Sequence, residues 1–219
     1  MSLKPSAKYL GVHLYQTLSL QLHVSSICWT NFLELRKIAS ICSNLYRNSA
    51  TMITSRLDYC SSIFELRMAL PAEQIARLQK VQNCTARLVM RKSKWDQIIP
   101  LLKELHRLPM TFWIRYNIAA FAYGHFEGSA PSYLSASLNI YYSISRLVFC
   151  DLLNEKIIKI PQTTLKTFGQ HSFTFLAPSV WNSLPASLRN TSSLACFRSK
   201  LKTHLFVQLS TTLFMYWLL

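Results

Sequence analysis

Six basic side chains and no acidic one lie between residues 77 and 94, and this imbalance is typical of a surface that binds polyanions. Five of them follow one another at spacings of 3, 7, 4 and 3 residues and form what we call the basic stripe: Arg77, Lys80, Arg87, Arg91 and Lys94. These spacings place the side chains in one sector of an α-helix, provided that the helix continues to Lys94. A row of cations gains affinity for a phosphate backbone by releasing counterions, without reading the bases. The basic stripe therefore predicts salt-sensitive, sequence-independent contact with the backbone of RNA or DNA.

Other interpretations of the basic stripe stay open at this point. A charged helix face can simply be solvated, although such faces usually carry both signs of charge and this one has no acidic residue between Glu73 and Asp96. The anionic surface of a membrane is another polyanionic partner. Among the aromatic residues, Tyr116 and Tyr123 have basic or polar neighbours in sequence and are the better candidates for stacking on a base.

The acidic residues are too dispersed to predict a catalytic site. Two-metal phosphoryl transfer needs carboxylates that converge on Mg²⁺, and among the nine acidic residues only Asp151 and Glu155 lie within five positions of each other. Four glycines leave no phosphate-cradling loop, and no two of the six cysteines are close enough in sequence for a zinc or redox motif. We therefore expect no enzyme activity, no cofactor, no metal site and no small-molecule substrate.

The overall charge points to the same kind of partner. The chain has 24 Lys and Arg against 9 Asp and Glu, a formal charge of +15, and half of its 219 residues are hydrophobic. Such a chain can bury a core, and its charge favours nucleic acid or an anionic surface. No secretory signal is evident at the N-terminus, so we expect an intracellular protein of the cytoplasm or nucleus that is not secreted. The apolar run at 213–219 is too short to span a membrane.

The hydrophobic pattern predicts a mainly α chain with one short N-terminal strand and an irregular C-terminal third. The strand falls at 9–14, and helices are expected at 20–45, 49–68, 71–91 and 110–125, where apolar residues recur at three- and four-residue spacing. No clean period appears over 139–160, and residues 168–177 alternate weakly, as a strand or an extended arm would. A last helix is expected after an N-cap at Ser192 or Ser193. Its inward residues would be Leu194, Phe197, Leu201 and Leu205, and its outward residues Arg198, Lys200 and Lys202.

The helix expected at 71–91 carries a second stripe besides the basic one. On a helical wheel its apolar residues form one sector: Ile75, Leu78, Val81, Thr85, Leu88 and Val89. The two stripes face different ways, so this helix can pack on a core and present cations at the same time.

Short motifs in a fixed order run through the chain from about residue 8 to residue 206. They are KYLGV at 8–12, SRLDYC at 55–60, RLQKVQN at 77–83, ARLV at 86–89, PLL at 100–102, LH at 105–106, LP at 108–109, APSYL at 130–134, Phe173 with Ala177 and Pro178, WNSLP at 181–185, and the stretch 197–206. Each motif alone is weak, whereas the ordered set is specific. It resembles the region that follows the catalytic palm of LINE-type (non-long-terminal-repeat) retrotransposon reverse transcriptases.

This resemblance implies a thumb-like helical bundle and a post-polymerase region that grips template and primer. The family's enzymes are palm, fingers and thumb polymerases that use Mg²⁺, and their metal-binding aspartate pair lies upstream of the strand seen here. No position in this sequence matches that pair, so no catalytic residue is carried over. The implied domains are a palm-edge strand remnant at 1–15, a thumb-like helical region at 16–125, a post-polymerase C-terminal region at 126–206 and an apolar tail at 207–219.

The chain also departs from the family's pattern. At some positions where the family commonly has Arg, this chain has another residue that a single base transition in an arginine codon produces: Trp29, Cys42, Trp95 and His171. Substitutions of this kind resemble drift in a degenerate genomic copy.

The sequence thus favours a non-catalytic fragment of such a reverse transcriptase, with residual sequence-independent binding to RNA or DNA. Helix faces that once packed on the palm would be exposed, so self-association through them is expected. The alternatives are a helical protein–protein interaction module without a nucleic-acid role and a weakly membrane-associated basic protein. The membrane is the less favoured partner.

Overall fold

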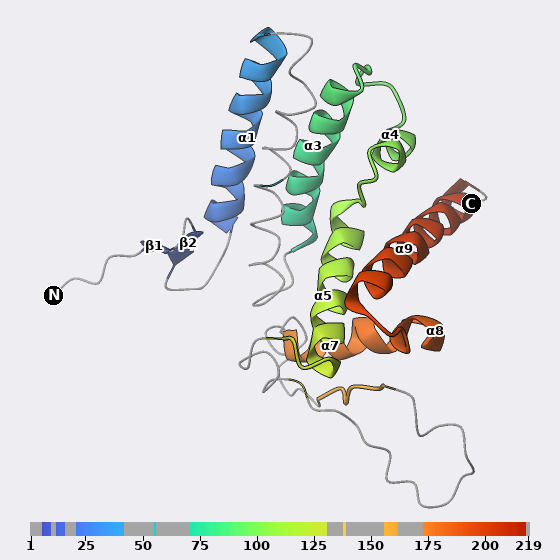
Figure 1. Ribbon diagram of the computed structural model, residues 1–219. Helices are drawn as coiled ribbons and strands as arrows, with labels where there is room; N and C mark the ends of the chain where they lie inside the picture. The colour runs from blue at the N-terminus through green and yellow to red at the C-terminus, as the bar shows by residue number, and fades with distance from the viewer. Residues whose placement is uncertain are drawn as a thin grey trace, which may run out of the picture. The chain divides into compact units, whose positions relative to one another are not determined.

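The computed structural model describes residues 6–9, 12–15, 21–41, 55, 71–130, 138, 156–161 and 173–217, and these residues are mainly helical (Figure 1). The mainly α class predicted from the hydrophobic pattern is confirmed. The chain forms two compact units: unit 1 contains Met1–Phe64 and Ala69–Thr111, and unit 2 contains Glu65–Met68 and Phe112–Leu219. The helix predicted at 49–68 lies almost entirely outside the described residues, and the domain boundaries implied by the resemblance stay a prediction.

Two four-residue strands stand where one short strand was expected. β1 (Ser6–Tyr9) pairs antiparallel with β2 (Val12–Tyr15), and Tyr9 is opposite Val12. Two residues of sequence separate Tyr9 from Val12, and this is the length of the commonest β-hairpin connections. The single strand at 9–14 is therefore not confirmed, because an apolar run alone does not show where a strand turns back.

Unit 1 is built on α1 (Gln21–Ile41) packed against α3 (Ala72–Val89), which lie side by side in Figure 1. The helices meet through apolar side chains at three- and four-residue spacing, as the pattern predicted. The buried core is Val24, Cys28, Leu35, Leu78, Val81 and Met110, flanked by the partly buried Ile27, Ile38, Ile75 and Leu88. This packing holds the helices in place, because most helical stability in proteins comes from burial of one face.

Asn31 lies within the buried face of α1 and is 1% exposed. In the part of the chain that the structure describes, neither its Oδ1 nor its Nδ2 has a hydrogen-bond partner, and such a group costs about 1–3 kcal/mol. We expect Asn31→Leu, whose side chain is similarly branched, to raise the free energy of unfolding by about 1–2 kcal/mol in urea denaturation. The control Asn31→Asp should lower it, since it buries a charge. Unchanged or reduced stability of Asn31→Leu would show that Asn31 is satisfied in solution.

Two helices that follow α3 end on a left-handed residue. α4 (Ile98–Glu104) is followed by His106 at φ 52°, and α5 (Met110–Phe126) by Gly128 at φ 67°. At the end of α4 the His106 N–H donates to a carbonyl of the last turn (2.9 Å), and the Arg107 N–H donates to another (2.8 Å). This is the Schellman motif, in which glycine is the usual left-handed residue because a Cβ is strained at positive φ.

The two helix ends predict opposite responses to substitution. His106→Gly is expected to raise the free energy of unfolding by about 0.5–1 kcal/mol, because it removes the strain of a Cβ at positive φ. Gly128→Ala is expected to lower it by about 1 kcal/mol, and this effect is purely conformational because a Cβ at Gly128 would meet open space. Thermal denaturation followed by circular dichroism measures both changes. Shifts of the same sign in the two variants would contradict this explanation.

Two glutamines of α3 hold the segment that leads into α5. Gln79 Oε1 accepts a hydrogen bond from the Met110 N–H (2.8 Å), and Gln82 Nε2 donates to the Leu108 carbonyl (2.9 Å). Gln79 Nε2 donates in turn to Gln82 Oε1 (2.8 Å), which links the two amides. A slip in the packing would leave these amides unpaired, so they fix the position of the segment along α3.

The C-terminal third is helical in its described part, which corrects the expectation of an irregular segment. It contains α7 (Phe173–Asn182), α8 (Ala186–Arg189) and α9 (Leu194–Trp217). α7 occupies half of the strand or extended arm expected at 168–177. Its buried residues Phe173, Ala177 and Trp181 recur every four positions, a helical period that the alternation of Phe173 with Phe175 concealed.

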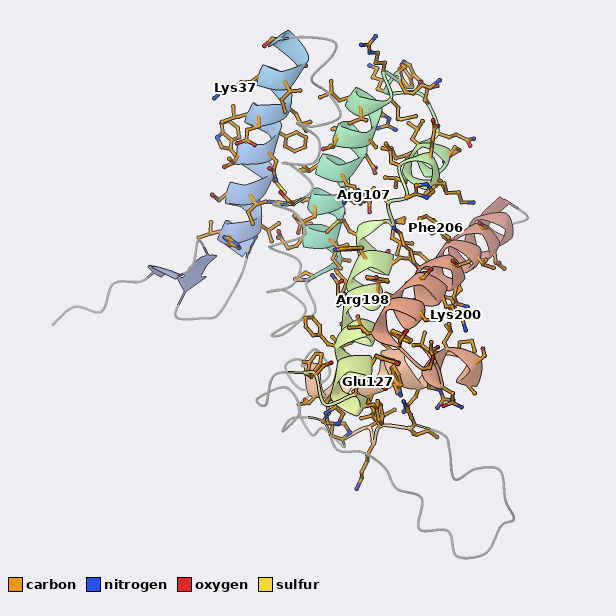
Figure 2. The ribbon with its side chains drawn as sticks, viewed as in Figure 1. Lys37, Arg107, Glu127, Arg198, Lys200 and Phe206 are labelled. Atoms are coloured by element: carbon orange, nitrogen blue, oxygen red, sulfur yellow. The ribbon has the colours of Figure 1, made fainter. Side chains whose placement is uncertain are left out.

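The last helix agrees with its prediction except at Lys202. Ser193 Oγ accepts a hydrogen bond from the Cys196 N–H (3.3 Å), as an N-cap residue does. Of the residues expected to face inward, Phe197, Leu201 and Leu205 are buried and Leu194 is half-buried. Of those expected to face outward, Arg198 and Lys200, labelled in Figure 2, are exposed, and Lys202 is half-buried. The apolar tail expected at 207–219 continues this helix to Trp217. Within the described residues, no helix combines the length and the apolar character needed to cross a membrane.

The core of unit 2 is aromatic. Tyr123, Trp181 and Phe197 are fully buried, and the rings of Tyr123 and Phe197 stack with their centroids 4.4 Å apart. The Trp181 ring lies 5.1 Å from that of Phe126 and 5.8 Å from that of Phe197. The Tyr123 hydroxyl donates to the Thr191 carbonyl (2.8 Å), so the polar end of the buried ring is satisfied.

The WNSLP motif at 181–185 binds the segment 156–161 to this core. Trp181 Nε1 donates to the Lys156 carbonyl (2.6 Å). Asn182 makes two hydrogen bonds to the main chain of Ile158, accepting from its N–H (3.2 Å) and donating to its carbonyl (2.9 Å). The buried Arg189 donates to the Leu184 carbonyl (3.2 Å) and to the Lys156 carbonyl (3.3 Å). Trp181 and Asn182 of this motif are therefore structural in this chain.

Candidate nucleic-acid interface

The helix α3 carries its apolar and its basic residues on different faces, as the sequence predicted. Leu78, Val81 and Thr85 are buried in unit 1, whereas Lys80 and Cys84 are exposed. The apolar face is fixed by packing against α1 and by the glutamine contacts, so Lys80 is held on the opposite side of a rigid element.

Arg77 occupies the edge of α3 that meets α1. Its guanidinium donates to Glu73 Oε1 (2.8 Å) and to Ser25 Oγ of α1 (3.2 Å). Its charge also acts on the neighbouring Cys28: burial raises the pKa of that thiol, and the Arg77 charge opposes the rise. Arg77 thus links α3 to α1, and the Glu73 carboxylate beside it partly neutralises its charge. It would therefore attract a phosphate less strongly than the sequence pattern suggested.

The helix α3 ends at Val89, so the basic stripe does not continue along it to Lys94. Arg91 has φ 51°, and the Arg91 and Lys92 N–H groups close a Schellman motif on the Leu88 and Arg87 carbonyls (3.2 and 2.9 Å). The condition for aligning all five cations on one helix, its continuation to Lys94, is therefore not met. Arg77, Lys80 and Arg87 lie on α3, whereas Arg91 and Lys94 lie on the turn that follows.

The turn after α3 gathers further positive charge. We call residues 91–97 the basic turn; all of them are exposed, and they include Arg91, Lys92 and Lys94. Arg87 leans from the helix toward this turn, because its Nη2 donates to the Asp96 carbonyl (3.2 Å). The exposed cations of the basic stripe therefore lie at two places: Lys80 on the helix, and Arg91 and Lys94 in the basic turn beyond its end.

Two carboxylates accompany the six cations of residues 71–97. Glu73 accepts from Arg77, and Asp96 Oδ2 accepts from the Ser93 N–H (2.6 Å). Lys80, Lys92 and Lys94 are exposed and none has a carboxylate within ion-pair distance in the described part of the chain. The positive electrostatic field of these three lysines therefore extends into solvent, and salt at 0.1 M would screen it beyond about 10 Å.

The two tyrosines considered for base stacking have rings that pack within the protein. Tyr123 is fully buried in unit 2, and burial raises the pKa of its hydroxyl. Tyr116 is half-buried, burial raises the pKa of its hydroxyl as well, and its ring stacks on Trp113 with centroids 5.2 Å apart. The sequence interpretation missed Trp95, which is 83% exposed in the basic turn. Its exposure could have been inferred from the sequence, because Trp95 lies among polar and charged residues and belongs to no periodic apolar pattern.

A second exposed surface in unit 1 is apolar. Trp29, Phe32 and Leu33 of α1 are 69%, 37% and 38% exposed, respectively. They line an open groove of about 450 Å³ together with Cys84 and Leu88 of α3. This is an apolar helix face of the kind expected from the sequence.

Metal ligands do not gather in the described residues: no three His, Cys, Asp or Glu side chains there could hold a metal ion. No family model, curated protein or solved structure matches this chain.

Proposed function

We propose that this chain is a non-catalytic fragment of a LINE-type retrotransposon reverse transcriptase that binds the backbone of RNA or DNA without regard to sequence. The observation that carries the proposal is the exposed cationic surface of unit 1, formed by Lys80 and the basic turn. The ordered motifs from about residue 8 to residue 206 support the origin. The proposal places the protein inside the cell, in the cytoplasm or nucleus, where such a surface meets nucleic acid.

The chemistry of this surface suits phosphates better than bases. Lysine ammonium groups are point charges on flexible stems, and they neutralise phosphates without the paired geometry that reads a base edge. Lys80 projects from a helix, and Lys92 and Lys94 project from a turn, so a strand could contact them in succession. Binding would then be dominated by counterion release.

The experiment is a titration of fluorescent oligonucleotides with the full chain, followed by anisotropy at several salt concentrations. With three or four phosphates neutralised, log K should fall with log salt at a slope of about −2 to −3 for a single strand. Scrambled sequences of equal length should bind equally well. A flat salt dependence, strong sequence preference, or no binding at about 50 mM salt would contradict the proposal.

The apolar face of α1 supports self-association as an accompanying property. Trp29 and its exposed neighbours would be withdrawn from water in a complex of two chains, and burial of apolar area is the main driving force of association. Sedimentation velocity over a range of protein concentrations would detect it as a rising sedimentation coefficient. A single species at all concentrations would reject it.

A further inference from the structure

Trp95 is displayed on unit 1 in a way that packing does not explain. It is 83% exposed, more than any other large hydrophobic residue that the structure describes, and it is the only apolar residue of the basic turn. Lys94 Nζ lies 4.7 Å from the centre of its ring, a cation–π contact. An indole in water with a cation over one face leaves the other face open to a planar partner.

Hydrogen bonds hold the backbone around Trp95. The Asp96 N–H donates to the Ser93 carbonyl (3.2 Å), and the Trp95 N–H donates to Ser93 Oγ (3.4 Å). Asp96 makes two further hydrogen bonds: its carboxylate accepts from the Ser93 N–H (2.6 Å), and its main-chain carbonyl accepts from the Arg87 guanidinium (3.2 Å). The turn is therefore closed on itself and anchored to α3, which keeps the indole away from the core.

We propose that Trp95 stacks on an unpaired base, so that the ligand of the basic turn is single-stranded nucleic acid; this inference rests on the proposed function. Every base has a π face, and base–aromatic stacking tolerates any sequence. In a duplex those faces are covered by neighbouring base pairs, whereas a single strand can turn one outward. Arg91, Lys92 and Lys94 surround the indole in sequence and would contact the phosphates on either side of the stacked base.

A lipid surface is the other partner that combines negative charge with room for an indole. The basic turn suits it poorly, because residues 91–97 contain one apolar side chain and form no amphipathic helix. Interfacial binding grows with the apolar area that enters the membrane, and one indole offers much less of it than the apolar face of an amphipathic helix. The observations therefore favour single-stranded nucleic acid, and the test includes the lipid as an outcome.

The test compares Trp95→Ala and Trp95→Phe with the unmodified full chain, using a single-stranded oligonucleotide and a duplex of equal length at several salt concentrations. Trp95→Ala should weaken single-strand binding roughly 5- to 100-fold and leave duplex binding and the salt slope unchanged. Trp95→Phe should keep most of the affinity, because it keeps an aromatic face. Thermal melting checks that the variants fold, and substitution of so exposed a side chain should not disturb the fold.

The outcomes separate the two proposals. If the unmodified chain binds with a steep salt slope and Trp95→Ala binds the single strand equally well, the stacking inference is overturned and the proposed function stands. Equal loss for single strand and duplex would also overturn stacking. If the unmodified chain binds neither oligonucleotide, both proposals fail. Vesicles of phosphatidylserine and phosphatidylcholine serve as the lipid probe: binding to them that requires Trp95, with oligonucleotide binding unaffected, would assign the residue to a membrane instead.

Discussion

Replacing Trp181 by alanine is expected to remove about 3–5 kcal/mol from the stability of unit 2. The side chain is fully buried, and its ring contacts Phe126 and Phe197. The substitution also removes the indole N–H that donates to the Lys156 carbonyl, 2.6 Å away. Because many domains have only 5–15 kcal/mol in total, we expect a broad or absent unfolding transition for unit 2.

The matched control for this variant is Trp95→Ala, which makes the same substitution at an exposed position. It should change the free energy of unfolding by less than about 0.5 kcal/mol. Guanidinium denaturation followed by far-UV circular dichroism measures both variants. Similar curves for the two would mean that Trp181 is not part of a packed core in solution. A conserving variant, Trp181→Phe, should fall between them because it keeps a ring but loses the hydrogen bond.

Reversing three charges of unit 1 is expected to abolish most nucleic-acid binding. The variant Lys80→Glu, Lys92→Glu, Lys94→Glu removes the exposed lysines of α3 and the basic turn and spares Arg77 and Arg87, which hold structural contacts. Affinity at low salt should fall about 100-fold or more, and the salt slope should lose about 2–3 units. Oligonucleotide anisotropy at several salt concentrations gives both values.

The matched control reverses three exposed cations of unit 2. Lys159, Arg198 and Lys200 are exposed, so changing them to Glu alters the net charge by the same amount. This control should weaken binding far less, since only the long-range field changes. If both triple variants lose affinity equally, binding follows net charge rather than the surface of unit 1.

Much of the fold was predictable because apolar spacing determines which faces are buried. The helices at 21–41, 72–89, 110–126 and 194–217 follow three- and four-residue periods, and α9 begins at the serine cap expected for it. The end of α3 was expected at about residue 91 and lies two residues earlier, at Val89. No glycine or proline marks it, and Arg91 adopts the left-handed conformation instead. The local sequence therefore carried no signal that the basic stripe would break.

The remaining errors have two causes: contacts distant along the chain, and a local ion pair that was not used. α7 is held by Trp181 and Asn182 bonding to residues near 156–158, which short-range periodicity cannot reveal. The Glu73–Arg77 ion pair could have been predicted from its four-residue spacing. It was overlooked because Glu73 lies just outside the stretch without acidic residues. Of the candidate site, the cations were predictable from charge alone. Their division between a helix and a turn needed the structure.

Lysine footprinting with an amine-reactive reagent tests the central claim most directly, because it reports both binding and its location. The full chain is modified with and without a saturating single-stranded oligonucleotide, and the modified lysines are quantified by mass spectrometry. We predict that the oligonucleotide protects Lys80, Lys92 and Lys94 and leaves Lys159 and Lys200 reactive. Protection confined to unit 2, or no protection anywhere under conditions of low salt, would contradict the assignment of a nucleic-acid interface to unit 1.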